Sequence, residues 1–403
     1  MENPPPLREL NPLLHHDVQE IIFSKLEAQD LKMLRLVCKA LADAVAAADA
    51  VSWNVKYPSQ LSTLCESKFV GTHNITTLRA HSPYFRNDSN LDSLMNLLEL
   101  KCAGCKNFTS EYLVKLVSLT RLDCSSCPNL SGDSFKPLVN LTELNCSYCE
   151  ELSNGCFDSL VGLTQLDCNR CWQLTNGCFD VLVNLVILDC NRCWQLTNGC
   201  FDALTNLTSL NCSGCQQLTN GCFDMLVNLK ELDCSHCEKL VDGCFDGLTN
   251  LTTLRCYDCK QLSSGCFATL VNLTELDCFD CDELVNGCFD SLTNLTHLDC
   301  SRCRRLSNGA FDMLVNLTEL DCNRCPQITN GSFDGLKKLT KLNCRSCEQL
   351  EDGCFDTHTN LTELICYDCD RISNDSFGVL ENLTELGCSA APSPIVPRRA
   401  SWI

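Results

Sequence analysis

Cysteine pairs are the residues in this chain whose type and spacing most directly suggest chemistry. Thirteen C-x-x-C pairs recur from Cys102/Cys105 to Cys366/Cys369, and eighteen residues separate each pair from the next. Two pairs at that spacing fit the four thiolate ligands of a structural zinc site. Stacked thiols also suit disulfide or redox chemistry, which belongs to oxidising compartments. The third interpretation is that the cysteines are buried packing residues.

A 22-residue period explains the cysteine spacing without a metal. Counting each unit from its first leucine, as in Leu163, the pairs occupy positions 6 and 9, and a further cysteine such as Cys156 occupies position 16. In other units position 16 holds Ser134, Ala310, Ser332 or Ser376. This series follows side-chain size rather than ligand chemistry, and free cysteine buries readily. We therefore expect packing, with position-9 thiols bonded to backbone groups, no metal site and no cofactor.

Carboxylates form the second chemical pattern. They recur at position 3, as Glu143, Glu231, Glu275, Glu319 and Glu363, and at position 5, as Asp167, Asp189, Asp233, Asp277, Asp299 and Asp321. General acid–base catalysis needs a pocket and a proton-transfer partner, and the pattern supplies neither. The chain also lacks a nucleophile elbow, a phosphate loop and an HExxH motif. We expect no catalytic residues and no enzymatic activity.

Composition narrows the class of protein. The 403 residues carry 31 Lys and Arg against 51 Asp and Glu, a net charge of −20, which disfavours nucleic-acid partners. The 45% apolar content indicates a folded chain. The first ten residues lack the features of a signal peptide, and no apolar run is long enough to span a membrane. A cytoplasmic protein, with the nucleus as a second compartment, is expected.

The same period resembles a known repeat. Leucines or isoleucine open fifteen units at a constant step of 22 residues, from Ile75 to Leu383. The unit L-T-x-L-D-C-x-x-C-x-x-L-T-N-G-C-F-D-x-L-x-N resembles the leucine-rich repeat in a cysteine-containing form. The resemblance implies an α/β repeat solenoid, a leucine-rich-repeat arc with a parallel sheet on its concave face.

Local patterns agree with that architecture. Alternation sends Leu166 and Cys168 to one face of a short strand and Gln165 and Asp167 to the other. One helical or 3₁₀ turn is expected on the outer side of each unit. No unit can bury its leucines alone, so neighbours must stack into one core. The short outer segments predict a gently curved arc.

The segment before the array has helical periodicity. Apolar residues recur at steps of three and four over residues 14–45, which predicts a small helical bundle. The segment also resembles an F-box through Leu14, Asp17, Val18, Ile22, Phe23, Leu26, Asp30, Leu31, Leu34, Val37, Cys38 and Lys39. It departs at His15, where the family prefers proline, and at Leu41, where it prefers tryptophan. The alternative is a helical cap that shields the first repeat.

The F-box resemblance implies a function. F-box proteins bind a Skp-family adaptor, which connects them through a cullin to ubiquitin-transfer subunits, while their repeats hold a target. The chain is then the substrate-recognition subunit of an SCF-type ubiquitin ligase. The alternative is an interaction scaffold unrelated to ubiquitin, in which the bundle is only a cap. The adaptor-binding residues implied are Leu14, Val18, Ile21, Ile22, Phe23, Leu26, Leu31, Leu34, Val37 and Cys38.

A target is expected on the concave face. Aromatic residues and arginines dominate interface energetics, and a surplus of carboxylates favours a basic target. We expect the arginines to neutralise part of the carboxylate columns. The candidate target-binding residues are Tyr148, Arg170, Arg192, Asp233, Tyr257, Asp277, Phe279, Arg302, Arg324 and Tyr367.

These patterns divide the chain into five segments. They are a flexible N-terminus (1–8), an F-box helical domain (9–55), a linker or N-terminal cap (56–74), about fifteen leucine-rich repeats (75–391) and a flexible tail (392–403).

Overall fold

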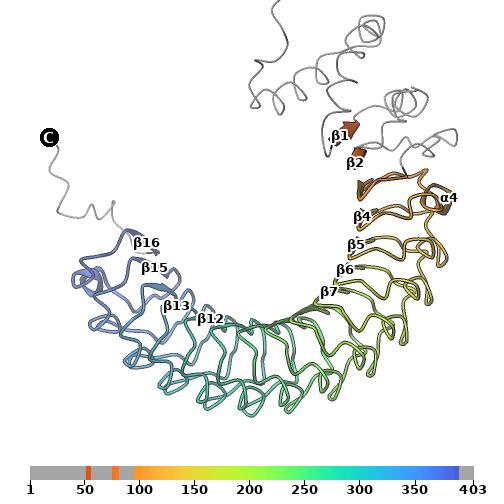
Figure 1. The fold of residues 1–403 in the computed structure, drawn as a ribbon. Helices are drawn as coiled ribbons and strands as arrows, with labels where there is room; N and C mark the ends of the chain where they lie inside the picture. Colours follow the sequence, from red (N-terminus) through yellow and green to blue (C-terminus); the bar gives the residue numbers. More distant parts are fainter. Residues whose placement is uncertain (1–50, 56–74, 81–94, 390–403) are drawn as a thin grey trace, which may run out of the picture.

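The repeats form a solenoid with one continuous parallel sheet. The computed structural model describes residues 51–55, 75–80 and 95–389. Its sixteen strands lie side by side in chain order (Figure 1). They are β1 (Val51–Val55), β2 (Ile75–Ala80), β3 (Glu99–Lys101), β4 (Arg121–Asp123), β5 (Glu143–Asn145), β6 (Gln165–Asp167), β7 (Ile187–Asp189), β8 (Ser209–Asn211), β9 (Glu231–Asp233), β10 (Thr253–Arg255), β11 (Glu275–Asp277), β12 (His297–Asp299), β13 (Glu319–Asp321), β14 (Lys341–Asn343), β15 (Glu363–Cys366) and β16 (Glu385–Cys388).

Strand pairing follows the sequence period without a slip from β3 onward. Leu232 of β9 pairs with Leu254 of β10, and Leu254 pairs with Leu276 of β11, each 22 residues further along. The predicted parallel sheet and its register are thus confirmed. The sheet also includes β1, which pairs with β2. The expected helical segment 9–55 is corrected here, because residues 51–55 form a strand; its remainder lies outside the described residues.

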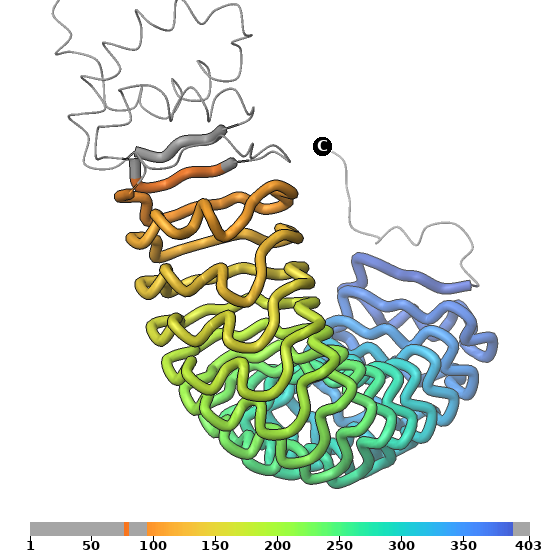
Figure 2. The backbone as a smooth tube through the Cα atoms, turned by 90° about the vertical axis from the view of Figure 1, so that its right-hand side faces the viewer, coloured from red at the N-terminus to blue at the C-terminus, as the bar shows by residue number. Residues whose placement is uncertain are grey.

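The predicted inside and outside faces of the strands are confirmed. Leu166 is 2% exposed and Cys168 is fully buried, whereas Gln165 is exposed. Buried leucines, cysteines and phenylalanines of successive units merge into one core that runs the length of the array. Because each rung is one coil of the chain (Figure 2), a core side chain contacts the rungs on both sides.

The outer side of the solenoid consists of turns rather than the helical layer that an α/β class implies. In a representative unit the Leu182 N–H donates to Phe179 O at 2.9 Å, and the Leu185 N–H donates to Leu182 O at 3.0 Å. The described residues include only two short helices, α4 (Ser110–Leu113) and η4 (Asn374–Phe377). Neither is long enough to span a membrane. Successive three-residue turns bring the chain back to the next strand before a longer helix can form.

The arc bends more than the gentle curve predicted from the sequence (Figure 1). Adjacent strands on the inner side are about 4.8 Å apart. On the outer side, position 17 forms a stack of buried phenylalanines, and the ring centroids of Phe135, Phe157 and Phe179 are 6.4 and 6.3 Å apart. This separation exceeds the strand spacing, so each rung is wider away from the sheet than at the sheet, and the array curves around its sheet.

The cysteines line the core as the packing interpretation predicts. The Cys171 thiol donates to Cys146 O at 3.3 Å, and the Cys149 thiol donates to Cys124 O at the same distance, so position 9 links each rung to the preceding one. Burial raises the pKa of the Cys168 thiol well above its ordinary value. In the part of the chain that the structure describes, no group of His, Cys, Asp or Glu has the arrangement of a metal site.

Polar ladders fix the spacing of the rungs at the start of the strands. At position 2, the Thr142 hydroxyl donates to Thr120 O and the Thr164 hydroxyl donates to Thr142 O, both at 3.0 Å. At position 22, Asn140 Nδ2 donates to Val117 O at 3.0 Å. Thr120 O and Thr142 O also accept backbone N–H bonds from the next rung, so the threonine hydroxyls add a side-chain bond to contacts that the backbone already makes.

The inside/outside assignment predicts different effects for two neighbouring residues of β9. Leu232 is 1% exposed, so Leu232→Asp buries an unpaired charge and should reduce the free energy of unfolding by about 3 kcal/mol or more. Glu231 is exposed, so Glu231→Ala should change it by less than about 1 kcal/mol. Urea denaturation followed by circular dichroism measures both variants. Similar losses in the two variants would contradict the assignment.

Candidate interaction surface on the concave face

The concave face of the sheet contains two open hollows. The larger, about 370 Å³, lies over β10–β15 and is lined by residues of positions 3 and 5. The smaller, about 270 Å³, lies over β3–β7. Position 3 and 5 side chains line both hollows because alternation along each strand points them away from the core. These two positions therefore determine what the concave face can bind.

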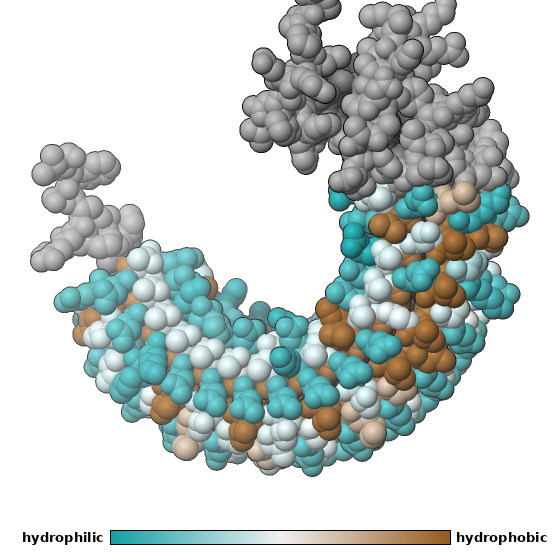
Figure 3. All heavy atoms as spheres, viewed as in Figure 1, coloured by the Kyte–Doolittle hydropathy of each residue, from teal (hydrophilic) through white to brown (hydrophobic). Residues whose placement is uncertain are grey.

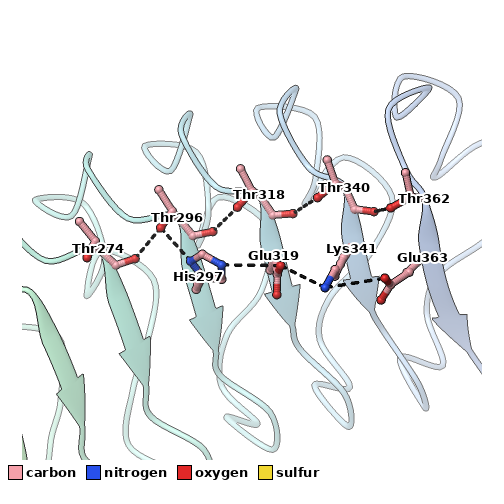
Figure 4. A network of polar contacts seen from close by, with 9 residues as sticks. All are labelled: Thr274, Thr296, His297, Thr318, Glu319, Thr340, Lys341, Thr362 and Glu363. Carbon is pink, nitrogen blue, oxygen red and sulfur yellow. Dashed lines mark hydrogen bonds and ion pairs between the residues drawn. The ribbon is translucent and has the colours of Figure 1, made fainter. Parts of the chain in front are cut away.

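Position 3 carries charges of both signs in the larger hollow (Figure 4). Lys341 Nζ lies 3.3 Å from Glu319 Oε1 and 3.7 Å from Glu363 Oε1, so one lysine bridges two rungs. His297 contacts the Thr296 hydroxyl through Nδ1 at 2.8 Å and Glu319 through Nε2 at 3.6 Å. Lys341, the lysine at this position, thus already has two carboxylate partners.

Position 5 carries half-buried aspartates that have no such partner. None of the position-5 aspartates forms an ion pair with another described residue. Burial raises the pKa of Asp167 and of Asp299 to about 6, and it also raises the pKa of Asp189 and of Asp277. A cation from outside would relieve the cost of keeping these carboxylates ionised.

Two of these aspartates share one serine. The Ser301 hydroxyl, which is fully buried, lies 2.5 Å from Asp299 Oδ1 and 2.6 Å from Asp321 Oδ1. A serine hydroxyl donates only one proton, so it can satisfy only one of the two carboxylates at a time. This geometry agrees with the raised pKa of Asp299. The centre of the larger hollow therefore holds more negative charge than its own residues can neutralise.

The smaller hollow is partly neutralised at its N-terminal end. Arg121 Nη2 lies 3.1 Å from Glu99 Oε2, and Lys101 Nζ lies 3.2 Å from Glu99 Oε1. Burial alone would raise the pKa of Glu99, but hydrogen bonds from Arg121 and Lys101 lower it below its ordinary value. Asp167 and Asp189, further along, lack such partners and keep raised pKa values.

Arginines and aromatic residues lie beyond the strand ends, at positions 7 and 8. The Arg170 guanidinium lies 4.9 Å from the Tyr148 ring centroid, and that of Arg302 lies 5.1 Å from the Phe279 ring centroid. Position 8 has a left-handed backbone, with φ of 59° at Arg170. The expectation that arginines neutralise the carboxylate columns is wrong for the position-8 arginines, because none pairs with a carboxylate of a described residue.

Two protein-family models match parts of this chain. A family model described as BspA type leucine rich repeat region matches residues 108–225, 176–296, 220–323 and 282–390, which together span 108–390. The chain belongs to the BspA-type leucine-rich-repeat family. A second model, the F-box domain, matches residues 12–47, so this leucine-rich-repeat protein also carries an F-box. Both recognitions made from the sequence are confirmed.

Solved structures with the same fold are distant in sequence. The TLR13–ssRNA13 complex is 20% identical with a TM-score of 0.63 over 84% of this chain and 57% of TLR13. InlJ from Listeria monocytogenes, whose functional domain includes a cysteine ladder, is 24% identical with a TM-score of 0.60 over 74% and 64%. The internalin InlF from the same organism is 19% identical with a TM-score of 0.59 over 74% and 82%.

These similarities establish the leucine-rich-repeat fold. The chain spans less than two thirds of the length of TLR13 and of InlJ. No curated protein matches the chain significantly. Leucine-rich-repeat and F-box modules typically mediate interactions rather than catalysis, which supports a protein-interaction architecture.

The candidate target-binding residues fall into separate groups along the repeat array. Tyr148 contacts Arg170, and Phe279 contacts Arg302, as described above. Tyr257 packs edge-on against His236 at 4.8 Å. Asp277 lies in the larger hollow. The remaining candidates belong to the same positions of other rungs: Arg192, Asp233, Arg324 and Tyr367. The adaptor-binding candidates, Leu14 to Cys38, lie outside the described residues.

The sequence reasoning missed three residues that shape the larger hollow. Arg255 replaces the usual carboxylate or amide at position 5, and His297 and Lys341 replace the usual residues at position 3. The sequence did contain this information, since each of these three residues differs from the carboxylates that adjacent units carry at the same repeat position. Interruptions in a column are thus a better guide to a specialised surface than the repeated residues.

The raised pKa of Asp299 predicts a pH-dependent stability. The folded state binds the proton more tightly, so this aspartate contributes stability at pH 4 that is lost as the pH rises through about 6. Asp299→Asn should increase the free energy of unfolding at pH 8 by about 1–2 kcal/mol, with a gain that disappears toward pH 4. Urea denaturation at pH 4, 6 and 8 measures this.

Another rung of this chain already carries asparagine at the position of Asp299, and an exposed aspartate provides the control for Asp299→Asn. Asn145 occupies position 5 of another rung and accepts hydrogen bonds from Ser147 at 3.0 and 2.8 Å, so asparagine fits the site. Asp290→Asn, on an exposed outer turn, should leave the pH dependence unchanged. A stability gain in Asp299→Asn that is equal at pH 4 and pH 8 would contradict the assignment of the raised pKa.

Proposed function

We propose that this chain is the substrate-recognition subunit of an SCF-type ubiquitin ligase. In this proposal the F-box, within residues 9–55, binds a Skp-family adaptor and through it a cullin. The leucine-rich repeats over residues 75–391 hold a target protein. Residues 56–74 connect the two parts, and residues 1–8 and 392–403 flank them. The observation that carries the proposal is an F-box match next to a long repeat array with an open concave face.

The chemistry of the concave face supports a role in binding rather than in catalysis. The hollows are open, and the half-buried aspartates lack a histidine or metal partner among the described residues with which they could transfer protons. We propose that ubiquitin transfer belongs to other subunits and that this chain acts in the cytoplasm or the nucleus, where that machinery operates.

The target segment that contacts the concave face is proposed to be basic. The position-5 aspartates form no ion pair with another described residue, and burial raises the pKa of Asp277 and of Asp299 in the larger hollow, although Arg255 on the neighbouring strand offsets part of this for Asp277. Lysine or arginine side chains would keep these carboxylates ionised and gain charge-assisted hydrogen bonds in return. The arginine–aromatic pairs that include Tyr148 and Phe279 add contact area beside the hollows.

Adaptor binding is tested with the full chain and a purified Skp-family adaptor. Ile22→Asp places a charge in the apolar stripe of the F-box and should weaken binding at least tenfold in isothermal titration calorimetry. Glu231→Ala, on the strand layer, should bind as the unmodified chain does. Absence of adaptor binding, or an unchanged affinity in Ile22→Asp, would contradict the proposal and favour the scaffold alternative.

Target chemistry is tested with a fluorescent twelve-residue peptide of alternating lysine and serine. The triple variant Asp277→Asn, Asp299→Asn, Asp321→Asn should bind it at least fivefold more weakly, and higher salt should weaken binding to the unmodified chain. The control changes three exposed aspartates on the outer turns of the same units: Asp290→Asn, Asp312→Asn and Asp334→Asn. Equal losses from both triple variants would show only a general charge effect.

A further inference from the structure

Asparagines at repeat position 14 form a ladder along the array. The chain contains seven Asn-Gly pairs, all at positions 14 and 15, and the asparagine of each is exposed: Asn154, Asn176, Asn198, Asn220, Asn286, Asn308 and Asn330. Hydrophilic side chains also occur along the whole length of the face drawn in Figure 3. Exposure to solvent therefore does not distinguish one of these asparagines from another.

In six of the seven pairs the next rung holds the carboxamide at both of its polar atoms. Asn176 is typical, because its Oδ1 accepts the Thr197 N–H at 2.9 Å and its Nδ2 donates to Asn198 O at 2.8 Å. Equivalent bonds to a backbone N–H and a backbone carbonyl hold Asn154, Asn198, Asn220, Asn286 and Asn330. Such a carboxamide cannot turn toward its own main chain without breaking two hydrogen bonds.

Asn308 is held differently because the next unit carries serine instead of cysteine at position 16. Ser332 Oγ accepts the Thr329 N–H at 3.2 Å, so this N–H is not directed at Asn308. Asn308 Oδ1 instead accepts the hydroxyl of Thr329, at 2.6 Å, and the hydroxyl of Ser332. Its Nδ2 has no hydrogen-bond partner among the residues that the structure describes. The ladder is thus broken at the amide nitrogen of this one Asn-Gly pair.

An Asn-Gly pair can modify itself without an enzyme. The glycine nitrogen attacks Cγ of the asparagine and forms a C–N bond, its proton reaches Nδ2 through solvent, and Nδ2 leaves as ammonia. Water then opens the five-membered imide at either carbonyl carbon, which gives aspartate or isoaspartate. One water is consumed and one ammonia is released, so no oxidant or reductant is needed. Glycine favours the attack because no Cβ obstructs the approach to its nitrogen.

The contacts of Asn308 favour this reaction. Two hydroxyl groups donate to Oδ1, the atom on which negative charge develops when Gly309 N adds to Cγ. The leaving group, Nδ2, is not tied to the next rung, so its departure breaks no hydrogen bond within the described chain. We propose that Asn308 is a site of spontaneous covalent modification, which closes onto Gly309 and becomes aspartate or isoaspartate ahead of the other six Asn-Gly pairs. The inference does not depend on the proposed function.

The aspartate product has a precedent elsewhere in the ladder. Asp352 occupies position 14 of another unit, and the unit after it again carries serine at position 16. Asp352 Oδ1 accepts the Ser376 hydroxyl and the Ser373 N–H, both at 2.6 Å. These hydrogen bonds lower the pKa of the Asp352 carboxyl below its ordinary value. An ionised carboxylate therefore fits beside a position-16 serine, and an aspartate at position 308 keeps the contacts that Asn308 Oδ1 already makes.

Peptide mass spectrometry on the full chain tests the order of modification. The protein is incubated at pH 8 and 37 °C, sampled over days and digested at acidic pH, where ring closure is slow. Asn308 should lose its amide at least fivefold faster than Asn286 and Asn330 of the adjacent units. In concentrated urea the seven rates should converge to within twofold. Equal rates in the folded chain, faster loss at another pair, or an equal lead of Asn308 in urea would overturn the proposal.

Exchange of the position-16 residue provides matched variants. Ser332→Cys should return the Thr329 N–H to Asn308 Oδ1 and slow the modification of Asn308 at least fivefold. The reverse change, Cys222→Ser, should accelerate the modification of Asn198 by a similar factor and leave Asn176 of the same chain unchanged. The array carries both residue types at this position, so thermal unfolding should stay within a few degrees. An unchanged rate at Asn308 in the first variant, or at Asn198 in the second, contradicts the assigned role of serine.

Discussion

Burial of each rung's leucines and thiols against the adjacent rungs is the constraint on which the structure depends. A unit with a three-residue strand such as β9 cannot enclose a core alone. Its inward side chains, Leu232 and Cys234, are covered only because identical positions of the neighbouring units lie directly above and below. The rung-to-rung hydrogen bonds of threonine, asparagine and cysteine serve the same end, because they hold every copy in one register.

The inner half of each rung could be predicted from the sequence because its period is short and strict. The alternation of side chains along the strand placed Leu166 and Cys168 inside. The small residues that replace cysteine at position 16 in other units identified the thiols as packing residues. The curvature and the outer turns could not be predicted, since they depend on how far apart successive rungs lie away from the sheet, which the packed phenylalanine rings show only in the structure. The stacking of Arg170 on Tyr148 depends on a left-handed backbone at position 8, for which Gly104 and Gly214 at that position were the only signal.

The charge state of the concave face could be read from the sequence only in sign. The repeated aspartates predicted a negative surface, but the burial of each carboxylate determines how much free energy its ionisation requires. Asp299 lies between neighbouring rungs, accepts its hydrogen bonds from Ser301, and has its pKa raised by burial. Position 3 is nearer to solvent and has its own cations, as at Lys341. The two columns therefore differ, because position-3 carboxylates such as Glu319 and Glu363 form ion pairs, whereas the position-5 aspartates form none with another described residue.

Duplication explains why functional positions are harder to recognise here than core positions. Copying a unit copies its outward residues with its inward ones, so a repeated surface residue carries little information about binding. Residues that differ from the repeated pattern are more informative about binding: Arg255 and Lys341 line the larger hollow at positions where neighbouring rungs carry carboxylates.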